Sequence, residues 1–279
     1  MEELRNIKNA NLIVTPYFEN WLLTHLDDSL SEEIISIIVQ EFRKPPYDDK
    51  RRLGGSSAGT CLRKQVLSYL GTTPTSLPNN HLRRIFHDGN WRHLRWQAAL
   101  LSAGIVSEIE VTVEDPETKV RGKIDAVGFV HEDHPNKLFR GKKFAFELKG
   151  AHDYAYRSYG KEGWRQYGDQ MVRYLNADPT IELYVLVVEN KNTNDYKEWV
   201  IRREDLGAAI AREHSELEAL NQAIDTRTLP PMLTQCAAGK GTLWTRCKFG
   251  GDTGQCVQLT EWPVKKRVIR PKNGATNKG

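Results

Sequence analysis

Cysteine is scarce in this chain, with four residues among 279, so a disulfide-rich secreted scaffold is excluded. No apolar run is long enough to span a bilayer, and no signal-like segment opens the sequence. We therefore expect an intracellular, cytoplasmic protein without membrane contacts. The glycine-rich stretch 54–59 lacks the lysine-serine ending of a Walker loop, which argues against a nucleotide site.

A strong excess of charge of one sign is also missing. The net charge is +4, with 39% hydrophobic and 27% charged residues, as in an ordinary globular protein with a substantial core. Basic residues cluster at 51–52, 83–84 and 265–267. Such clusters can meet phosphate groups, although each one alone is more often solvated surface.

The most informative stretch is 121–150, where two apolar runs of strand character flank a polar loop. Asp125 lies in the first run, and Glu147 and Lys149 lie at the end of the second. Alternation places Glu147 and Lys149 on one face of the strand and Leu148 on the other. Converging carboxylates are costly to bury without compensation, and a divalent cation would compensate them.

The surrounding pattern predicts an α/β (α+β) fold with a mixed central sheet flanked by helices. Helical patterns cover 12–42, 62–70, 81–102, 163–175 and 204–224, and strand patterns cover 105–113, 120–130, 181–188 and 196–201. A capping box from Ser29 to Glu32 is expected in the first helical region. Glu108 and Glu110 could support a metal site, but we expect both to face solvent.

Two residue pairs flank the central hairpin at helical spacing. Gly89 and His93 are four apart on one predicted helix, and Gln170 and Tyr174 are four apart on another, so each pair shares a helix face. The chain thus contains four short motifs in a fixed order: Gly89-x-x-x-His93, Gly122-x-x-Asp125, Glu147-x-Lys149 and Gln170-x-x-x-Tyr174. Together they resemble the RecB-like PD-(D/E)xK nuclease superfamily, over roughly residues 61–256.

The resemblance implies a restriction-endonuclease-like fold and a metal-dependent DNA nuclease. Asp125 and Glu147 would bind Mg²⁺ or Mn²⁺, with His93 and the main-chain carbonyl of Leu148 as further ligands. The ion would hold the scissile phosphate and lower the pKa of a bound water. Lys149 would orient or help to deprotonate that water.

The resemblance further implies that Gln170 and Tyr174 position the DNA backbone, although the Tyr174 ring could instead pack into the core. The expected activity is exonucleolytic, on single-stranded DNA or DNA ends. A structure-specific or restriction-type endonuclease is one alternative. Another is a DNA-end-binding component of a repair, recombination or CRISPR-adaptation assembly, with a protein partner docked on the amino-terminal helices. Oligomeric state and a viral origin stay open.

The cysteines Cys61, Cys236, Cys247 and Cys256 resemble those of the iron–sulfur members of this superfamily, the CRISPR-associated exonuclease and AddB types. There, one early and three late thiolates hold a [4Fe-4S] cluster, which we expect here. The late cysteines are separated by ten and eight residues, unlike the family's Cys-x-x-Cys pair. Zinc or free thiols are the alternatives.

The sequence divides into three expected parts. Residues 1–50 form a helical amino-terminal extension, 51–262 form the nuclease domain with its cysteine-rich end, and 263–279 form a basic, disordered tail.

Overall fold

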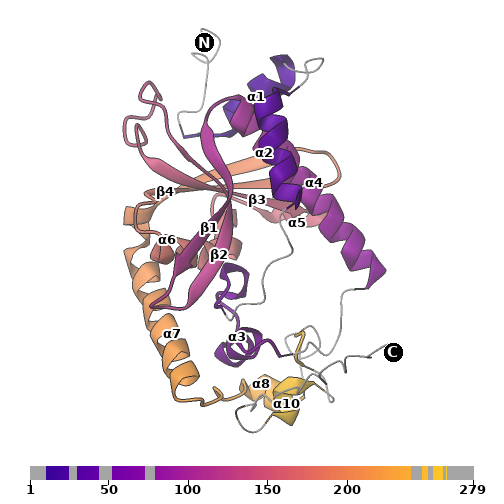
Figure 1. Ribbon diagram of the computed structural model, residues 1–279, viewed down its shortest axis with the longest axis vertical. Coiled ribbons are helices and arrows are strands. Elements are labelled where there is room, and N and C mark those ends of the chain that lie inside the picture. Colours follow the sequence, from indigo (N-terminus) through magenta and orange to yellow (C-terminus); the bar gives the residue numbers. More distant parts are fainter. Residues whose placement is uncertain are drawn as a thin grey trace, which may run out of the picture.

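The computed structural model describes residues 11–24, 30–43, 52–72, 79–239, 247–250, 254–259 and 262. These residues form a five-stranded mixed sheet with helices on both faces (Figure 1), which confirms the predicted fold class. The strands are ordered along the sheet as they are in sequence: β1 (Val106–Asp115), β2 (Val120–Phe129), β3 (Lys143–Ala151), β4 (Leu183–Asn190) and β5 (Tyr196–Arg202). The predicted tail 263–279 lies outside the described residues.

One parallel strand pair interrupts an otherwise antiparallel sheet. β3 pairs in parallel with β4, and the other neighbours pair antiparallel. A parallel pair needs a crossover, which is built by α5 (Asp153–Ser158), the 3-10 turn η3 (Gly163–Tyr167) and α6 (Gly168–Ala177). The predicted helix 163–175 therefore begins as a 3-10 turn, and α5 was not predicted. β4 is buried along its whole length, as its continuous apolar run indicates.

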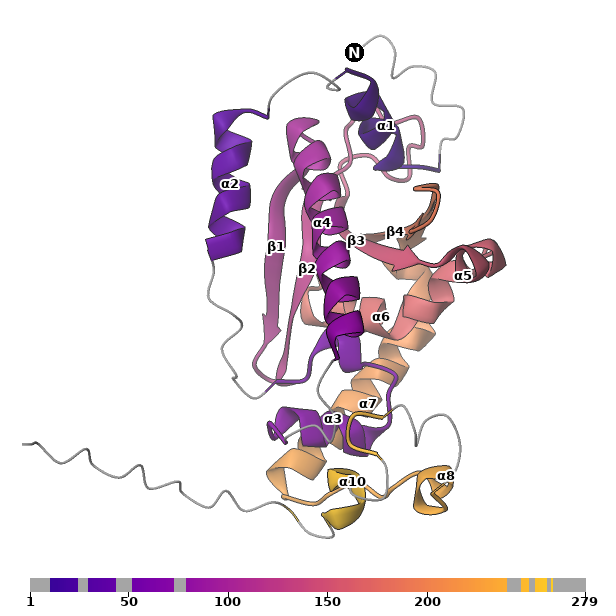
Figure 2. The same cartoon turned by 90° about the vertical axis from the view of Figure 1, so that its right-hand side faces the viewer.

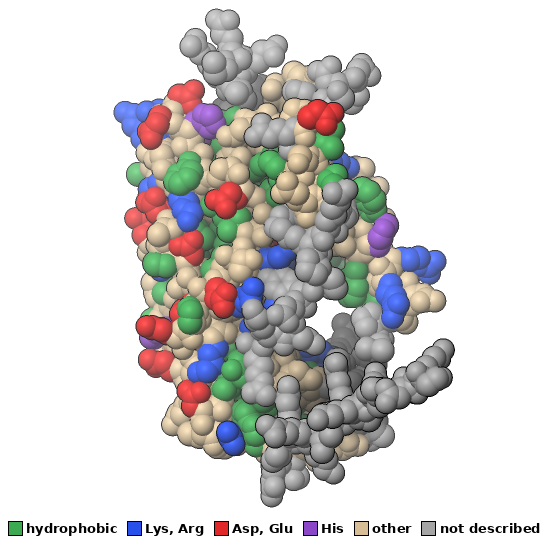
Figure 3. Space-filling view, viewed as in Figure 1, with side chains coloured by type: hydrophobic (Ala, Val, Ile, Leu, Met, Phe, Trp, Pro, Cys, Tyr) green, Lys and Arg blue, Asp and Glu red, His purple; other side chains and the backbone are tan. Residues whose placement is uncertain are grey.

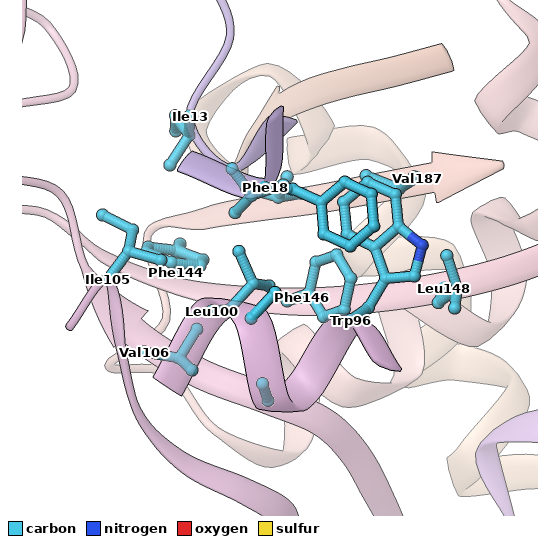
Figure 4. Packing of buried hydrophobic residues seen from close by; sticks show 14 of the residues in the cluster. Ile13, Phe18, Trp96, Leu100, Ile105, Val106, Phe144, Phe146, Leu148 and Val187 are labelled. Carbon is cyan, nitrogen blue, oxygen red and sulfur yellow. The ribbon is translucent and has the colours of Figure 1, made fainter. Parts of the chain in front are cut away.

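The first face of the sheet is covered by α1 (Thr15–Thr24) and α4 (Asn80–Ser102), with α2 (Glu32–Arg43) beside α4 (Figure 2). The rings of Phe18 and Trp96 stack with centroids 3.7 Å apart over Phe146 (Figure 4). The predicted helical region 12–42 thus contains two helices. Ser31 caps the second one by accepting the Ile34 N–H at 3.3 Å, whereas the predicted cap, Ser29, lies outside the described residues.

The second face is covered by α6 and by α7 (Gly207–Asp225), which is preceded by the short 3-10 turn η4 (Arg203–Leu206). Ala145 packs toward this face, while Phe144, Phe146 and Leu148 pack toward the first. Alternation in β3 therefore buries both of its faces, as the sequence predicts.

The amino-terminal helices pack on the core. Ile13, Val14 and Phe18 share a buried cluster with the sheet. Glu198 of β5 accepts hydrogen bonds from the N–H groups of Ile13 and Thr15 at 2.5 and 2.8 Å. It thereby provides an acceptor for backbone N–H groups at the start of α1, although Ile13 lies 185 positions away in the sequence.

A separate group of helices lies beyond the end of the sheet (Figures 1 and 2). It consists of α3 (Leu62–Tyr69), α8 (Thr234–Ala237) and α10 (Gln255–Gln258), preceded by the 3-10 turn η2 (Gly55–Ser57). The Arg63 guanidinium donates to the carbonyl oxygens of Pro230, Cys256 and Leu259, which ties early and late segments together. No helix in the described part of the chain is both long and apolar enough to cross a membrane.

Candidate active site

Three neighbouring strands each place an acidic residue at one level of the sheet. The preceding row of paired residues is Ile109, Ala126 and Phe146. The next row across the three strands contains Glu110, Asp125 and Glu147. The β2–β3 ladder ends at the preceding row, so the strands separate where the acids begin. Adjacent carboxylates repel, and the local contacts offset this repulsion.

Asp125 is held by the main chain of β3 and faces His93 of α4. Its Oδ2 atom accepts the Leu148 N–H at 2.8 Å and lies 3.2 Å from His93 Nδ1. Gln97, one turn further along α4, donates to the Asp125 carbonyl at 2.9 Å. The N–H of Leu148 thus contacts the site through Asp125. The metal contact expected of its carbonyl stays a prediction.

Glu147 is 3% exposed and accepts three hydrogen bonds. Its Oε1 atom accepts from Lys149 Nζ at 2.5 Å and from Gln170 Nε2 at 2.8 Å, and its Oε2 atom accepts from the Tyr184 hydroxyl at 3.3 Å. Burial and the neighbouring Asp125 raise the pKa of Glu147 to about 7, although Lys149 and His93 oppose this shift. The group therefore changes charge near neutral pH in the metal-free protein.

Lys149 and His93 are the two cationic partners of these acids. Burial alone would lower the pKa of Lys149, but the carboxylates of Glu147 and Asp125 outweigh it, and the pKa is raised. The pKa of His93 is also raised, since Asp125 overcomes the opposing effect of burial. Both groups favour their charged forms beside the row of acids.

Glu110 joins the site, which corrects the expectation that it faces solvent. One ligand atom from each of His93, Glu110 and Asp125 lies within 4.8 Å of the others, a grouping suited to a metal ion. Glu110 has a backbone φ of +50°, a conformation rare in a strand and often found at functional sites. Its carboxylate accepts from Gln97 and Lys123 at 3.1 and 3.2 Å. Glu108 is exposed, as expected.

Helix α6 brings Gln170 to Glu147 but turns Tyr174 into the core. Tyr174 is 4% exposed, and its ring fills the space beside two glycines. A Cβ atom added to Gly55 or to Gly122 would lie 2.4 Å from that ring. Of the two alternatives for Tyr174, its position fits core packing, and DNA contact by this ring stays a prediction.

Buried charges that the sequence analysis did not single out fix the helices around the site. Glu189, at the end of β4, accepts from Arg95 Nη2 at 2.6 Å and from Trp96 Nε1 at 2.9 Å, and it pairs with Arg92. These bonds hold α4 on both sides of His93. Arg173 of α6 is buried and donates to Glu213 at 2.6 Å and to Gln65 at 2.8 Å, which fixes α6 against α7 and α3.

The four cysteines line one cavity beyond the sheet, with a volume of about 460 Å³. Burial, followed by nearby thiols, raises the pKa of Cys236; burial also raises the pKa of Cys256, although Arg63 opposes it. A tetrahedral zinc site with 2.3 Å bonds holds its sulfurs about 3.8 Å apart. In the described part of the chain, no three of these sulfurs lie within 4.8 Å of one another.

Comparisons with known proteins do not define a family for this chain. No protein-family model matches it. The citryl-spermidine/3,4-dihydroxybenzoyl-citryl-spermidine:spermidine ligase of Bacillus anthracis is 28% identical over 122 residues, or 40% of this chain. The matched region spans only 20% of the ligase. The crystal structure of SSO0001 is similar over 83% of this chain and 96% of its own, at 14% identity and a TM-score of 0.41.

Proposed function

We propose that the protein is a divalent-metal-dependent DNA nuclease with a restriction-endonuclease-like core of the RecB type. The observation that carries this proposal is the row Glu110, Asp125 and Glu147, with Lys149 bonded to its most buried member. Three aligned carboxylates beside one lysine suit a site that binds a cation and acts on a phosphodiester.

The donor set favours Mg²⁺ or Mn²⁺. Glu110 and Asp125, which lie in one group with His93, would supply hard oxygen ligands, and His93 would supply a nitrogen that favours manganese. Glu147 would add a carboxylate from the neighbouring strand. A bound ion would neutralise the row, polarise a phosphate and lower the pKa of a water. The Leu148 carbonyl would be a further ligand.

The side chains around the ion have separate tasks in this proposal. Lys149 places a positive charge where the attacking water and the phosphate would meet, and so orients the water and offsets developing charge. Gln170 holds the Glu147 carboxylate in position through its 2.8 Å hydrogen bond. Gln97 bridges Glu110 and the Asp125 carbonyl, so it keeps β1 and β2 in line at the site.

We further propose that the activity is exonucleolytic, on single-stranded DNA or DNA ends. End-labelled linear DNA and circular single-stranded DNA, each with Mn²⁺ or Mg²⁺, separate the alternatives. An exonuclease degrades the linear substrate alone, whereas an endonuclease also cuts the circle. Binding without cleavage of either would favour a DNA-end-binding component of a larger assembly.

Two substitutions test the site itself. Glu147→Ala and Lys149→Ala should each lower the cleavage rate at least about 100-fold, because each removes a charge beside the reacting phosphate. Glu108→Ala, on the exposed side of β1, is the matched control and should cleave normally. Normal cleavage by either site variant would refute the proposal.

We also propose that Cys61, Cys236, Cys247 and Cys256 hold a [4Fe-4S] cluster in their shared cavity. The observation that supports this proposal is that all four cysteines line one cavity of about 460 Å³. Lys64 lines the cavity and Lys248 lies near Cys247, and positive charge suits a group bound by four thiolates. The cluster would join the two ends of the domain and take no part in hydrolysis.

A further inference from the structure

The first half of α4 projects from the body of the molecule (Figure 1). Beyond the buried residues 96–100, this half presents large apolar side chains to solvent. Leu82 is 42% exposed and Phe86 is 56% exposed. Exposed apolar side chains grouped on one element mark an interaction surface more often than scattered ones do.

These side chains lie on the helix face that leads to the candidate metal site. Leu82, Phe86, Gly89 and His93 are spaced by four, three and four residues, so they form one stripe along α4. A Cβ atom added to Gly89 would meet no atom within 4 Å, so the stripe is open between Phe86 and His93. Seven residues of helix separate these two side chains by about 10 Å along the axis.

The charge around the stripe suits a polyanion. Arg83 lies three residues before Phe86 and therefore beside it on the helix surface, while Arg84 and His87 lie on other faces of the same half of α4. Basic side chains and a histidine are visible at the projecting end in Figure 3. Its acidic residue, Asp88, is paired with Arg92 at 3.0 Å. An exposed aromatic ring beside basic residues is the combination with which proteins hold single-stranded nucleic acid.

We propose that this stripe, residues 82–93 of α4, is a stacking platform for single-stranded DNA. A base stacks on Phe86, Arg83, one turn before it on the helix surface, contacts the backbone, and the gap at Gly89 lets the strand approach His93. The proposal rests on the proposed function and deepens it by naming the form of the substrate. Duplex DNA fits poorly, because its bases are already stacked on one another.

The test is a binding measurement without added metal, in a chelator, so that cleavage plays no part. Its probes are a single-stranded oligonucleotide, a blunt duplex and an abasic strand of equal length. Phe86→Ala should weaken single-strand binding by about 5- to 150-fold, the range for losing one stacked base. Phe129→Ala, which truncates an equally exposed ring (56%) on β2, is the control and should bind normally.

Two further comparisons separate stacking from general attraction. Phe86→Ala should leave binding of the abasic strand unchanged, since no base is present to stack. Arg83→Ala should lower the slope of log affinity against log salt by about 0.7, the value for one phosphate contact on a single strand. Arg212→Ala, an exposed residue of α7, should leave that slope unchanged.

Several outcomes would overturn the platform. Single-strand binding that Phe86→Ala leaves intact would do so, as would equal weakening for the abasic strand. Self-association that Phe86→Ala abolishes, without DNA binding, would identify a contact between copies instead. Phe86-dependent binding with no cleavage in Mn²⁺ would support the stacking platform and contradict the proposed nuclease activity. Cleavage that does not depend on Phe86 would support the nuclease activity and contradict the platform.

Discussion

Glu147 shows how a single residue responds to the crowding of charge in the site. Its carboxylate is buried next to Asp125, and Lys149 and Gln170 bond the same oxygen atom. The free protein thus keeps a proton on or near this group at pH values where an exposed glutamate has lost it. Metal binding would displace that proton, which couples affinity to pH.

The stability of the metal-free protein should fall as pH rises from about 4.5 to about 7. The pKa of Glu147 is raised from 4.5 to about 7, so the folded state holds more protons than the unfolded state in this window, and folding is favoured at its acidic end. We expect a loss of about 1–3 kcal/mol, measured by denaturant unfolding in a chelator. Glu147→Gln should flatten the slope, and stability that rises through this window would contradict the assignment.

Glu110 should contribute directly to metal affinity. Glu110→Gln removes a ligand charge while it keeps the size of the side chain, and we expect Mn²⁺ affinity to fall by about 10- to 100-fold in calorimetric titration. Glu108→Gln is the matched control on the same strand and should bind Mn²⁺ normally. Equal Mn²⁺ affinities of the two variants would contradict the assignment of Glu110 as a metal ligand.

The residues of the site differ in how far the sequence reveals them. Asp125, Glu147 and Lys149 follow from strand patterns and alternation. Glu110 was assigned to solvent because alternation does not reveal a positive φ. The turn that pairs Asp115 with Val120 carries the missing signal. From Glu108 to Asp115, the numbers of paired residues sum to 235, and this register sets Glu110 opposite Asp125. Glu189 and Arg173 have partners far away in the sequence, which no local pattern contains.

At the scale of elements, two glycines determine how closely α6 packs on the sheet. Gly55 of η2 and Gly122 of β2 leave the space that the Tyr174 ring occupies. One turn earlier on the same helix, Gln170 reaches Glu147. The depth at which α6 sits on the sheet therefore determines where the Gln170 amide lies.

Gly122→Ala should destabilise the protein by about 1–3 kcal/mol, because the new methyl group would lie 2.4 Å from the Tyr174 ring. Tyr174→Leu in the same chain should recover part of this loss, since it removes the ring atoms. Gly89→Ala is the control with open space and should stabilise α4 by up to about 1 kcal/mol. Denaturant midpoints are measured for the wild-type protein, Gly122→Ala, Tyr174→Leu, the double variant and Gly89→Ala. Strictly additive losses for Gly122→Ala and Tyr174→Leu would contradict the contact.

The same scale shows which elements local pattern predicts. The continuous apolar run of β4 and the two runs of the β2–β3 hairpin identify buried strands. α5 and η2 were missed, because segments this short depend on their surroundings more than on their own pattern. The 3-10 start of the predicted helix 163–175 likewise reflects how the crossover meets the sheet.

For the molecule as a whole, the four-cysteine cavity joins segments that are distant in sequence. Cys61 precedes α3, while the other three cysteines follow α7. Arg63 reinforces the junction through the carbonyl oxygens of Pro230 and Cys256. A group bound by all four thiolates would close a loop around most of the sheet and restrict the unfolded chain.

Protein purified without oxygen should contain iron and acid-labile sulfide in equal amounts. Cys236→Ala should lower both, and should lower the free energy of unfolding by about 3–5 kcal/mol, as for a clamp on a long loop. Cleavage chemistry should survive where the fold does, since the strand site lies elsewhere. Zinc without sulfide would favour a zinc site, and neither metal would favour free thiols.

The span of chain between Cys61 and Cys256 also sets an order of events during synthesis. Because Cys256 comes 195 positions after Cys61, a ribosome needs about 10–40 s to make the last thiol after the first, at 5–20 residues per second. Arg63 can form its hydrogen bonds to the carbonyl oxygens of Pro230, Cys256 and Leu259 only after these residues have been made. The sheet can form first, and the cavity is completed last. If the four thiolates bind a cluster, as proposed above, that binding can be completed only after the last of them has been made.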